Sequence, residues 1–232
     1  MNLRHFLKNI PAYIEARMVY HFLILLVNAY FLIEFLATRF GDRTWLQKFA
    51  YLTCLNQVSI VIYYFMVLFY NIKLYVNGYP RLQIKRCPTM LLTYLKTNLS
   101  ISCLVVISFW TMKTFFPDML IPKKIEDQIK VSACVEIWIH LLNFMFLLVD
   151  LIWEKHPKFL IHNDKQIHIF FVIFFSYVVI LISFNLVYKK HVYPFLKDLT
   201  FVIASLMGII TIGLLVISDL ILSFMMQELW EN

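Results

Sequence analysis

The stretch KFAYLTCLNQVSIVIYYFMVLFY, residues 48–70, decides the fold class. Its apolar run matches the roughly 20 residues that an α-helix needs to cross the hydrocarbon core of a bilayer. Thr53 and Asn56 lie three residues apart near the start of this run, on one helical face. A helix surface that faces hydrocarbon gains nothing from a hydroxyl and an amide. The pattern therefore predicts that this face contacts polar groups elsewhere in the chain.

The composition indicates an integral membrane protein. Of 232 residues, 61% are hydrophobic, 17% are aromatic and only 15% are charged. The apolar runs are continuous and do not alternate, which predicts helices and not the strands of a barrel. We expect an all-α, polytopic membrane helix bundle that forms a single multi-pass domain over residues 1–232. The six predicted transmembrane helices are 18–38, 50–71, 97–116, 132–153, 167–188 and 199–224.

Residues 1–17, MNLRHFLKNIPAYIEAR, mix basic and apolar side chains and contain Pro11. This pattern predicts a short interfacial helix on the membrane surface, and not part of a signal peptide. The net charge of +7 is spread over the N-terminus and every loop, so lipid phosphates are the expected counter-ions and nucleic acid is not. Counting Lys and Arg by side gives eleven against ten, so the positive-inside rule does not decide the orientation.

The four cysteines have no paired spacing for a disulfide framework or a metal, and the sequence has no phosphate-binding loop. We therefore predict no cofactor and no metal. Cys54 follows Thr53 directly, but neighbouring helix residues point about 100° apart, so the two cannot face one pocket.

Ionisable groups at membrane depth are costly and usually face the interior of a bundle. Several of them lie close enough to span ends to reach the interface: His21, Glu34, Lys113, Asp150 and His168. The deeper ones are Glu136, His140 and Asp219.

Glu136, His140 and Asn143 fall at i, i+4 and i+7 in the fourth span and share one helical face. Spans 2 and 4 enter the membrane from the same side, and Thr53 and His140 differ in depth by roughly 5 to 8 Å, which helix tilt can absorb. The two side chains can therefore meet, and a hydroxyl beside a neutral imidazole is a nucleophile with its general base. The alternatives are a structural histidine and a threonine that bonds its own i−4 carbonyl.

Several short motifs carry a family resemblance: YLTCLN (51–56), SFW (108–110), FPDMLIPK (116–123), His140 and VYPFL (192–196). Together they resemble the androgen-induced membrane protein family. The resemblance implies an intramembrane hydrolase of fatty acid esters of hydroxy fatty acids, with Thr53 as the nucleophile and His140 as its partner. It also implies cytosolic termini. The expected ligands are a lipid ester dissolved in the bilayer and the lipids of the endoplasmic reticulum or plasma membrane.

The chain departs from the family pattern at two places. Glu136 stands where the family has the first residue of an Asn-His-x-x-His run, and the Arg-Asp pair and proline of the third span are missing. Asn56 is a candidate hydrogen-bond donor to the oxyanion, or an amide that links two helices. Glu136 is a candidate group for orienting His140, or a purely structural partner of that histidine. Asn143 completes the polar face, and Asp219 is a partner for either site or for Lys96. The rival functions are a non-enzymatic scaffold or regulator and a small-molecule transporter.

Overall fold

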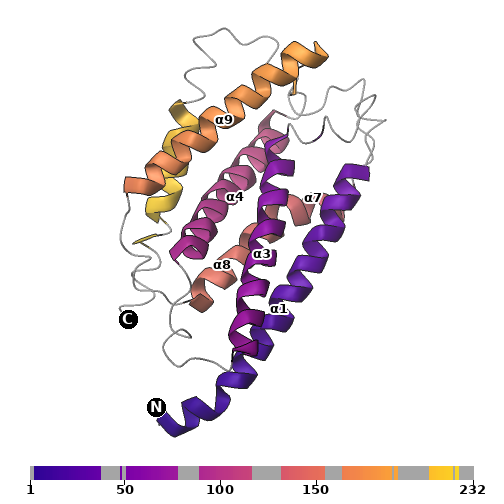
Figure 1. The fold of residues 1–232 in the computed structure, drawn as a ribbon. Coiled ribbons are helices and arrows are strands. Elements are labelled where there is room, and N and C mark those ends of the chain that lie inside the picture. Colours follow the sequence, from indigo (N-terminus) through magenta and orange to yellow (C-terminus); the bar gives the residue numbers. More distant parts are fainter. Residues whose placement is uncertain are drawn as a thin grey trace.

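A computed structural model describes residues 3–37, 48, 51–77, 89–116, 132–154, 164–189, 191–192, 209–221 and 223–224. Long helices lie side by side in it (Figure 1). The labelled elements are α1 (Leu3–Ala37), α3 (Leu52–Val76), α4 (Thr89–Phe115), α7 (Ala133–Ile137), the π-helix η1 (Trp138–Leu142), α8 (Asn143–Glu154) and α9 (Asp164–Tyr188). The part of the chain that the structure describes contains no strand, so the predicted all-α class is confirmed.

Five helices are long and apolar enough to cross a membrane. They cover Ile14–Ala37, Leu52–Val76, Met90–Phe115, Ala133–Trp153 and His168–Tyr188. These ranges match five of the six predicted spans. The sixth prediction, 199–224, coincides with a shorter apolar helix at Ile209–Ile221, and the remainder of that prediction lies largely outside the described residues.

The start of the third span was predicted too late. The sequence placed it at residue 97, whereas α4 begins at Thr89 and its membrane-length segment at Met90. Lys96 made the earlier residues look like a loop, but its side chain is buried inside the bundle. Asn98, the acceptor of the sequon Asn98-Leu99-Ser100, is fully buried in the same helix, which leaves no room for a glycan.

The N-terminal segment is continuous with the first membrane helix. α1 runs from Leu3 to Ala37, so residues 3–17 do not form a separate helix. Figure 1 shows α1 changing direction in its N-terminal part. Pro11 belongs to that part of the sequence, and a proline, which lacks a backbone N–H, is a common cause of helix bending. A position at the membrane surface stays a prediction.

The bundle is held together around α3. α1 packs along α3, and α4 and α8 complete a central apolar cluster in which Tyr63, Tyr64 and Leu147 are almost fully buried. Burying side chains of this size supplies much of the packing that holds helices together in lipid.

By contrast, the apolar segment of α9, His168–Tyr188, is strongly hydrophobic, yet only 11% of it is buried. It lies at the outside of the bundle in Figure 1, with most of its surface available to lipid.

Consecutive membrane helices cross in opposite directions. The Leu52 end of α3 therefore shares one membrane face with the Phe115 end of α4 and the Ala133 end of α7. We call this the Leu52 face. The opposite face holds the Val76 end of α3 and the Trp153 end of the fourth span. The candidate site lies in the half of the bundle nearest the Leu52 face.

Candidate active site

Asn56 shows what the polar face of α3 contacts. Its amide donates a hydrogen bond to the Ser102 hydroxyl of α4, over 3.1 Å, and both side chains are buried. Asn56 thus links two helices, one of the two roles predicted for it. Thr53 lies one turn before Asn56 and is half-buried on the same face, toward α4. Among the described residues, the Thr53 hydroxyl has no hydrogen-bond partner.

A second polar contact fixes the level of the fourth span against α3. The Asn143 amide donates to the Gln57 side-chain oxygen. The Gln57 amide in turn donates to the backbone and side-chain oxygens of Asn28 in α1, each over 3.0 Å. All three side chains are at least 97% buried, so polar groups are paired inside the bundle where lipid offers none.

The Asn143–Gln57 pair sets the register of the candidate catalytic residues. His140 precedes Asn143 by three residues and Cys54 precedes Gln57 by three, so His140 lies at the level of Cys54, next to Thr53. Packing agrees with this register, because Cys54 and Ile139 belong to one buried apolar cluster. Cys54 is fully buried there and turned away from the Thr53 face.

His140 lies in the π-helix η1, between α7 and α8. A π-turn inserts one extra residue and re-aims the side chains around it, and such turns are frequent at functional sites. The His140 ring stacks on Phe109 of α4, with ring centroids 3.5 Å apart and an interplanar angle of 4°. His140 therefore faces α4 at Phe109, and no hydrogen bond joins it to Thr53.

The imidazole of His140 is buried and incompletely paired. Only 8% of the residue is exposed, and its Nδ1 has no hydrogen-bond partner among the described residues. A buried polar atom without a partner carries a free-energy cost, so a native structure that retains one calls for an explanation. A general base needs a nitrogen that is free to accept a proton, and this requirement explains an unpartnered Nδ1.

Glu136 contacts Lys113 of α4 through an ion pair. The sequence suggested His140 as the contact of Glu136, whereas this ion pair directs the carboxylate toward Lys113 of α4. The Lys113 ammonium lies 5.5 Å from the centroid of Phe109, the ring on which His140 stacks. These contacts join Glu136, Lys113, Phe109 and His140 into one assembly at the outer edge of the site.

Lys48 lies between the first two spans. It is buried and donates a hydrogen bond to the Leu36 carbonyl in the last turn of α1. This contact satisfies one of the carbonyls that a helix C-terminus leaves open. Burial lowers the pKa of Lys48 below its ordinary value.

Asp219 lies in the other half of the bundle. Its carboxylate is 3.7 Å from the Lys96 ammonium, and both side chains are buried. Lys96 precedes Phe109 by thirteen residues, which is about 20 Å along α4. Lys96 is therefore the partner of Asp219, one of the alternatives left open by the sequence, and the pair ties the helix at residues 209–221 to α4.

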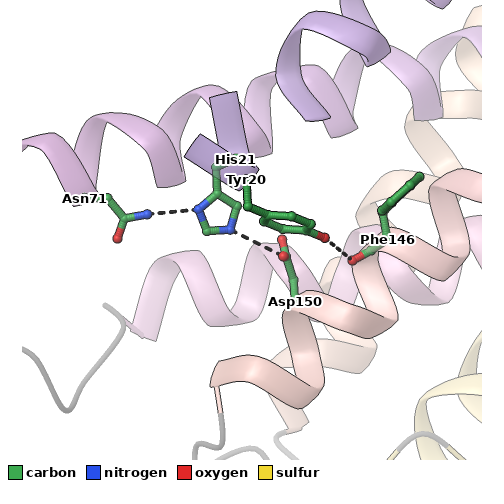
Figure 2. A network of polar contacts seen from close by, with 5 residues as sticks. All are labelled: Tyr20, His21, Asn71, Phe146 and Asp150. Carbon is green, nitrogen blue, oxygen red and sulfur yellow. Dashed lines mark hydrogen bonds and ion pairs between the residues drawn. The ribbon is translucent and has the colours of Figure 1, made fainter. Parts of the chain in front are cut away.

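Sequence reasoning missed a buried network near the opposite face (Figure 2). The His21 imidazole lies between the Asn71 amide, 3.0 Å from its Nδ1, and the Asp150 carboxylate, 3.3 Å from its Nε2. Tyr20 beside it donates to the Phe146 carbonyl over 3.4 Å. His21 and Asp150 were predicted to lie close enough to span ends to reach the interface, and the structure shows that both are almost fully buried among the helices. They pair across helices and so need no water.

A periodic signal was available for this network. His21 and Asn28 in α1, and Asn143 and Asp150 in α8, are separated by seven residues, which is two turns of helix. Two polar residues seven apart in each of two spans indicate facing helix surfaces. No group of three or more His, Cys, Asp or Glu side chains able to hold a metal ion occurs in the described part of the chain.

Fold and site together define a multi-pass α-helical membrane protein with a buried imidazole in a π-helix of the fourth span. The chain belongs to the FAR-17a/AIG1-like protein family, whose model matches residues 16–227. This match confirms the family resemblance seen in the short motifs. Neither curated proteins nor solved structures gave a significant match.

Proposed function

We propose that this protein is an intramembrane ester hydrolase that uses Thr53 as its nucleophile and His140 as its general base. The observation that carries the proposal is the buried imidazole of His140, whose Nδ1 has no partner among the described residues. The contact between Asn143 and Gln57, each three to four residues beyond a candidate, supports a position of His140 close to Thr53. Family membership is consistent with hydrolase chemistry. Catalytic contacts in a ligand-free protein are often long and tighten only when substrate binds, so the absence of a Thr53–His140 hydrogen bond does not oppose it.

The reaction proceeds as acyl transfer. The Thr53 oxygen attacks the ester carbonyl while His140 accepts the hydroxyl proton. When the tetrahedral intermediate collapses, the alcohol part of the ester leaves and takes the proton from His140. Water then attacks the acyl-threonine, gives a proton to His140 and releases the fatty acid, after which the Thr53 oxygen regains its proton. Every proton transfer uses the same imidazole, and the cycle requires no cofactor.

The proposed substrates are esters that dissolve in the bilayer, with fatty acid esters of hydroxy fatty acids as the preferred class. A site one to two turns inside a leaflet receives its substrate from lipid, where each CH₂ has already gained about 0.8 kcal/mol by leaving water. Chain length should therefore alter enrichment in the membrane more than recognition of the carbonyl. Phospholipids and triacylglycerols, which are bulky around the carbonyl, should be poor substrates of an interhelical site.

Substitution of the two catalytic candidates tests the proposal. Thr53→Ala should abolish hydrolysis in purified, folded protein, and His140→Ala should lower kcat about a hundredfold or more. The double variant should be little worse than either single one, because the two residues act as a unit. Thr114→Ala and His168→Ala serve as matched controls, since both side chains are exposed and lie outside the site.

A fluorophosphonate probe gives a second readout, because only an activated nucleophile should be labelled covalently. Labelling should disappear in Thr53→Ala and persist in Thr114→Ala. Hydrolysis at the parent rate in Thr53→Ala or His140→Ala would defeat the proposal. Complete absence of labelling and hydrolysis in the parent protein would instead favour the scaffold or regulator alternative.

Matched esters in mixed micelles at fixed surface concentration test the substrate class. We expect faster turnover of the branched fatty acid ester than of phospholipid or triacylglycerol. Faster turnover of phospholipid would indicate a phospholipase and a different pocket.

A further inference from the structure

The structure points to Lys113 as a binding residue for the carboxylate of a long-chain lipid at the outer edge of the site, a position that Glu136 occupies in the ligand-free protein. This inference rests on the proposed function for its location, and it assigns a recognition element that the catalytic pair does not supply. It concerns a ligand with an acyl chain and a free carboxylate.

Lys113 lies between the catalytic candidates and the membrane surface. It is in the last turn of α4, at the Leu52 face, and its side chain is 41% exposed. Phe109 lies one turn deeper on the same face of α4, about 6 Å along the helix axis, and its ring stacks on His140. A lipid whose headgroup reaches Lys113 can therefore extend its chain past Phe109 toward the level of His140.

The contact with Glu136 shows that a carboxylate fits beside Lys113. The Lys113 ammonium already binds the Glu136 carboxylate and lies 5.4 Å from the Trp110 ring centroid and 5.5 Å from that of Phe109. Aromatic rings and a carboxylate form a setting in which a cation is retained near lipid. The chemistry around Lys113 is thus suited to a carboxylate that carries an apolar chain.

Displacement of Glu136 is energetically reasonable. The Glu136 side chain is 24% exposed and that of Lys113 is 41% exposed, and ion pairs in contact with solvent contribute little to stability. A lipid carboxylate confined to the same leaflet competes at high local concentration, so it can replace Glu136 without a large penalty. Glu136 then acts as an internal competitor that keeps Lys113 neutralised until an anionic lipid binds.

Two substitutions with opposite expected signs test this inference. Binding of oleate and of oleyl alcohol is measured by displacement of a pyrene-labelled fatty acid, with the protein in phosphatidylcholine nanodiscs at alkaline pH, where the fatty acid is ionised. Lys113→Gln should weaken oleate binding about fivefold, equivalent to about 1 kcal/mol, and leave oleyl alcohol unchanged. Glu136→Gln should strengthen oleate binding, because it removes the competing charge.

Lys73→Gln is the matched control, since Lys73 is exposed in the last turn of α3 at the opposite face. The inference is overturned if Lys113→Gln weakens both ligands equally, if Glu136→Gln weakens oleate binding, or if the parent protein binds oleate no better than oleyl alcohol. The assay contains no ester and is repeated in Thr53→Ala. Failure of the hydrolase proposal therefore leaves its result intact, and the two outcomes can be told apart.

Discussion

The imidazole of His140 lies flat against the Phe109 ring, with centroids 3.5 Å apart and planes 4° from parallel. Stacking fixes the plane of an imidazole while leaving its nitrogens free to exchange protons. Phe109 therefore acts as a positioning residue in the proposed reaction, because it holds the base without hydrogen bonding to it.

Replacing the stacking ring should separate positioning from binding. Phe109→Leu should lower kcat by about tenfold to a hundredfold with little change in KM, because small misplacement of a catalytic group is costly. Phe109→Tyr keeps an aromatic face and should restore most of the rate. Steady-state kinetics on the branched ester provides the measurement. Equal losses in the Leu and Tyr variants would show that stacking does not matter.

The Asn143–Gln57 contact should support both stability and activity. Asn143→Val removes the donor to Gln57 and should destabilise the protein by about 0.5 to 2 kcal/mol, the range for interhelical hydrogen bonds in membranes. Hydrolysis should also fall, because the contact sets the level of His140. Thermal unfolding in detergent measures the first effect. Met145→Val, at a side chain that is 48% exposed, is the control and should alter neither property.

The His21–Asp150 pair should show strong coupling in a double-mutant cycle. His21→Phe alone leaves the Asp150 carboxylate buried without its partner and should cost about 3 to 5 kcal/mol of unfolding free energy. The double variant His21→Phe/Asp150→Leu removes both polar groups and should be more stable than His21→Phe. Additive losses would contradict the pairing shown in Figure 2.

Five membrane-length helices and the shorter helix at residues 209–221 are consistent with the six predicted crossings, which would put both chain termini on one side of the membrane; the predicted side is the cytosol. Tags fused at residues 1 and 232 should both resist protease added to intact cells and both be cleaved after permeabilisation. A lumenal or extracellular loop tag between the first two spans marks membrane integrity. Opposite accessibility of the two terminal tags would exclude an even number of spans.

The sequence by itself determined the class of protein, most of the membrane helices and the two catalytic candidates. Apolar length is a local property, because each helix must pair its backbone groups within its own segment of chain. Five spans were therefore predicted to within a few residues at most ends. The third began too late because hydropathy treats Lys96 as exposed, whereas Asp219, more than a hundred residues away, neutralises it.

Only the tertiary structure decided which polar groups meet. Depth along a helix can be read from residue numbers, so the sequence could predict that Thr53 and His140 differ in depth by only about 5 to 8 Å, which helix tilt can absorb. The sequence could not show that Asn56 is engaged by Ser102, that Glu136 turns to Lys113, or that Phe109 covers His140. These contacts depend on the rotation of each helix about its axis and on the π-turn at residues 138–142, and both are set by packing between segments distant in sequence.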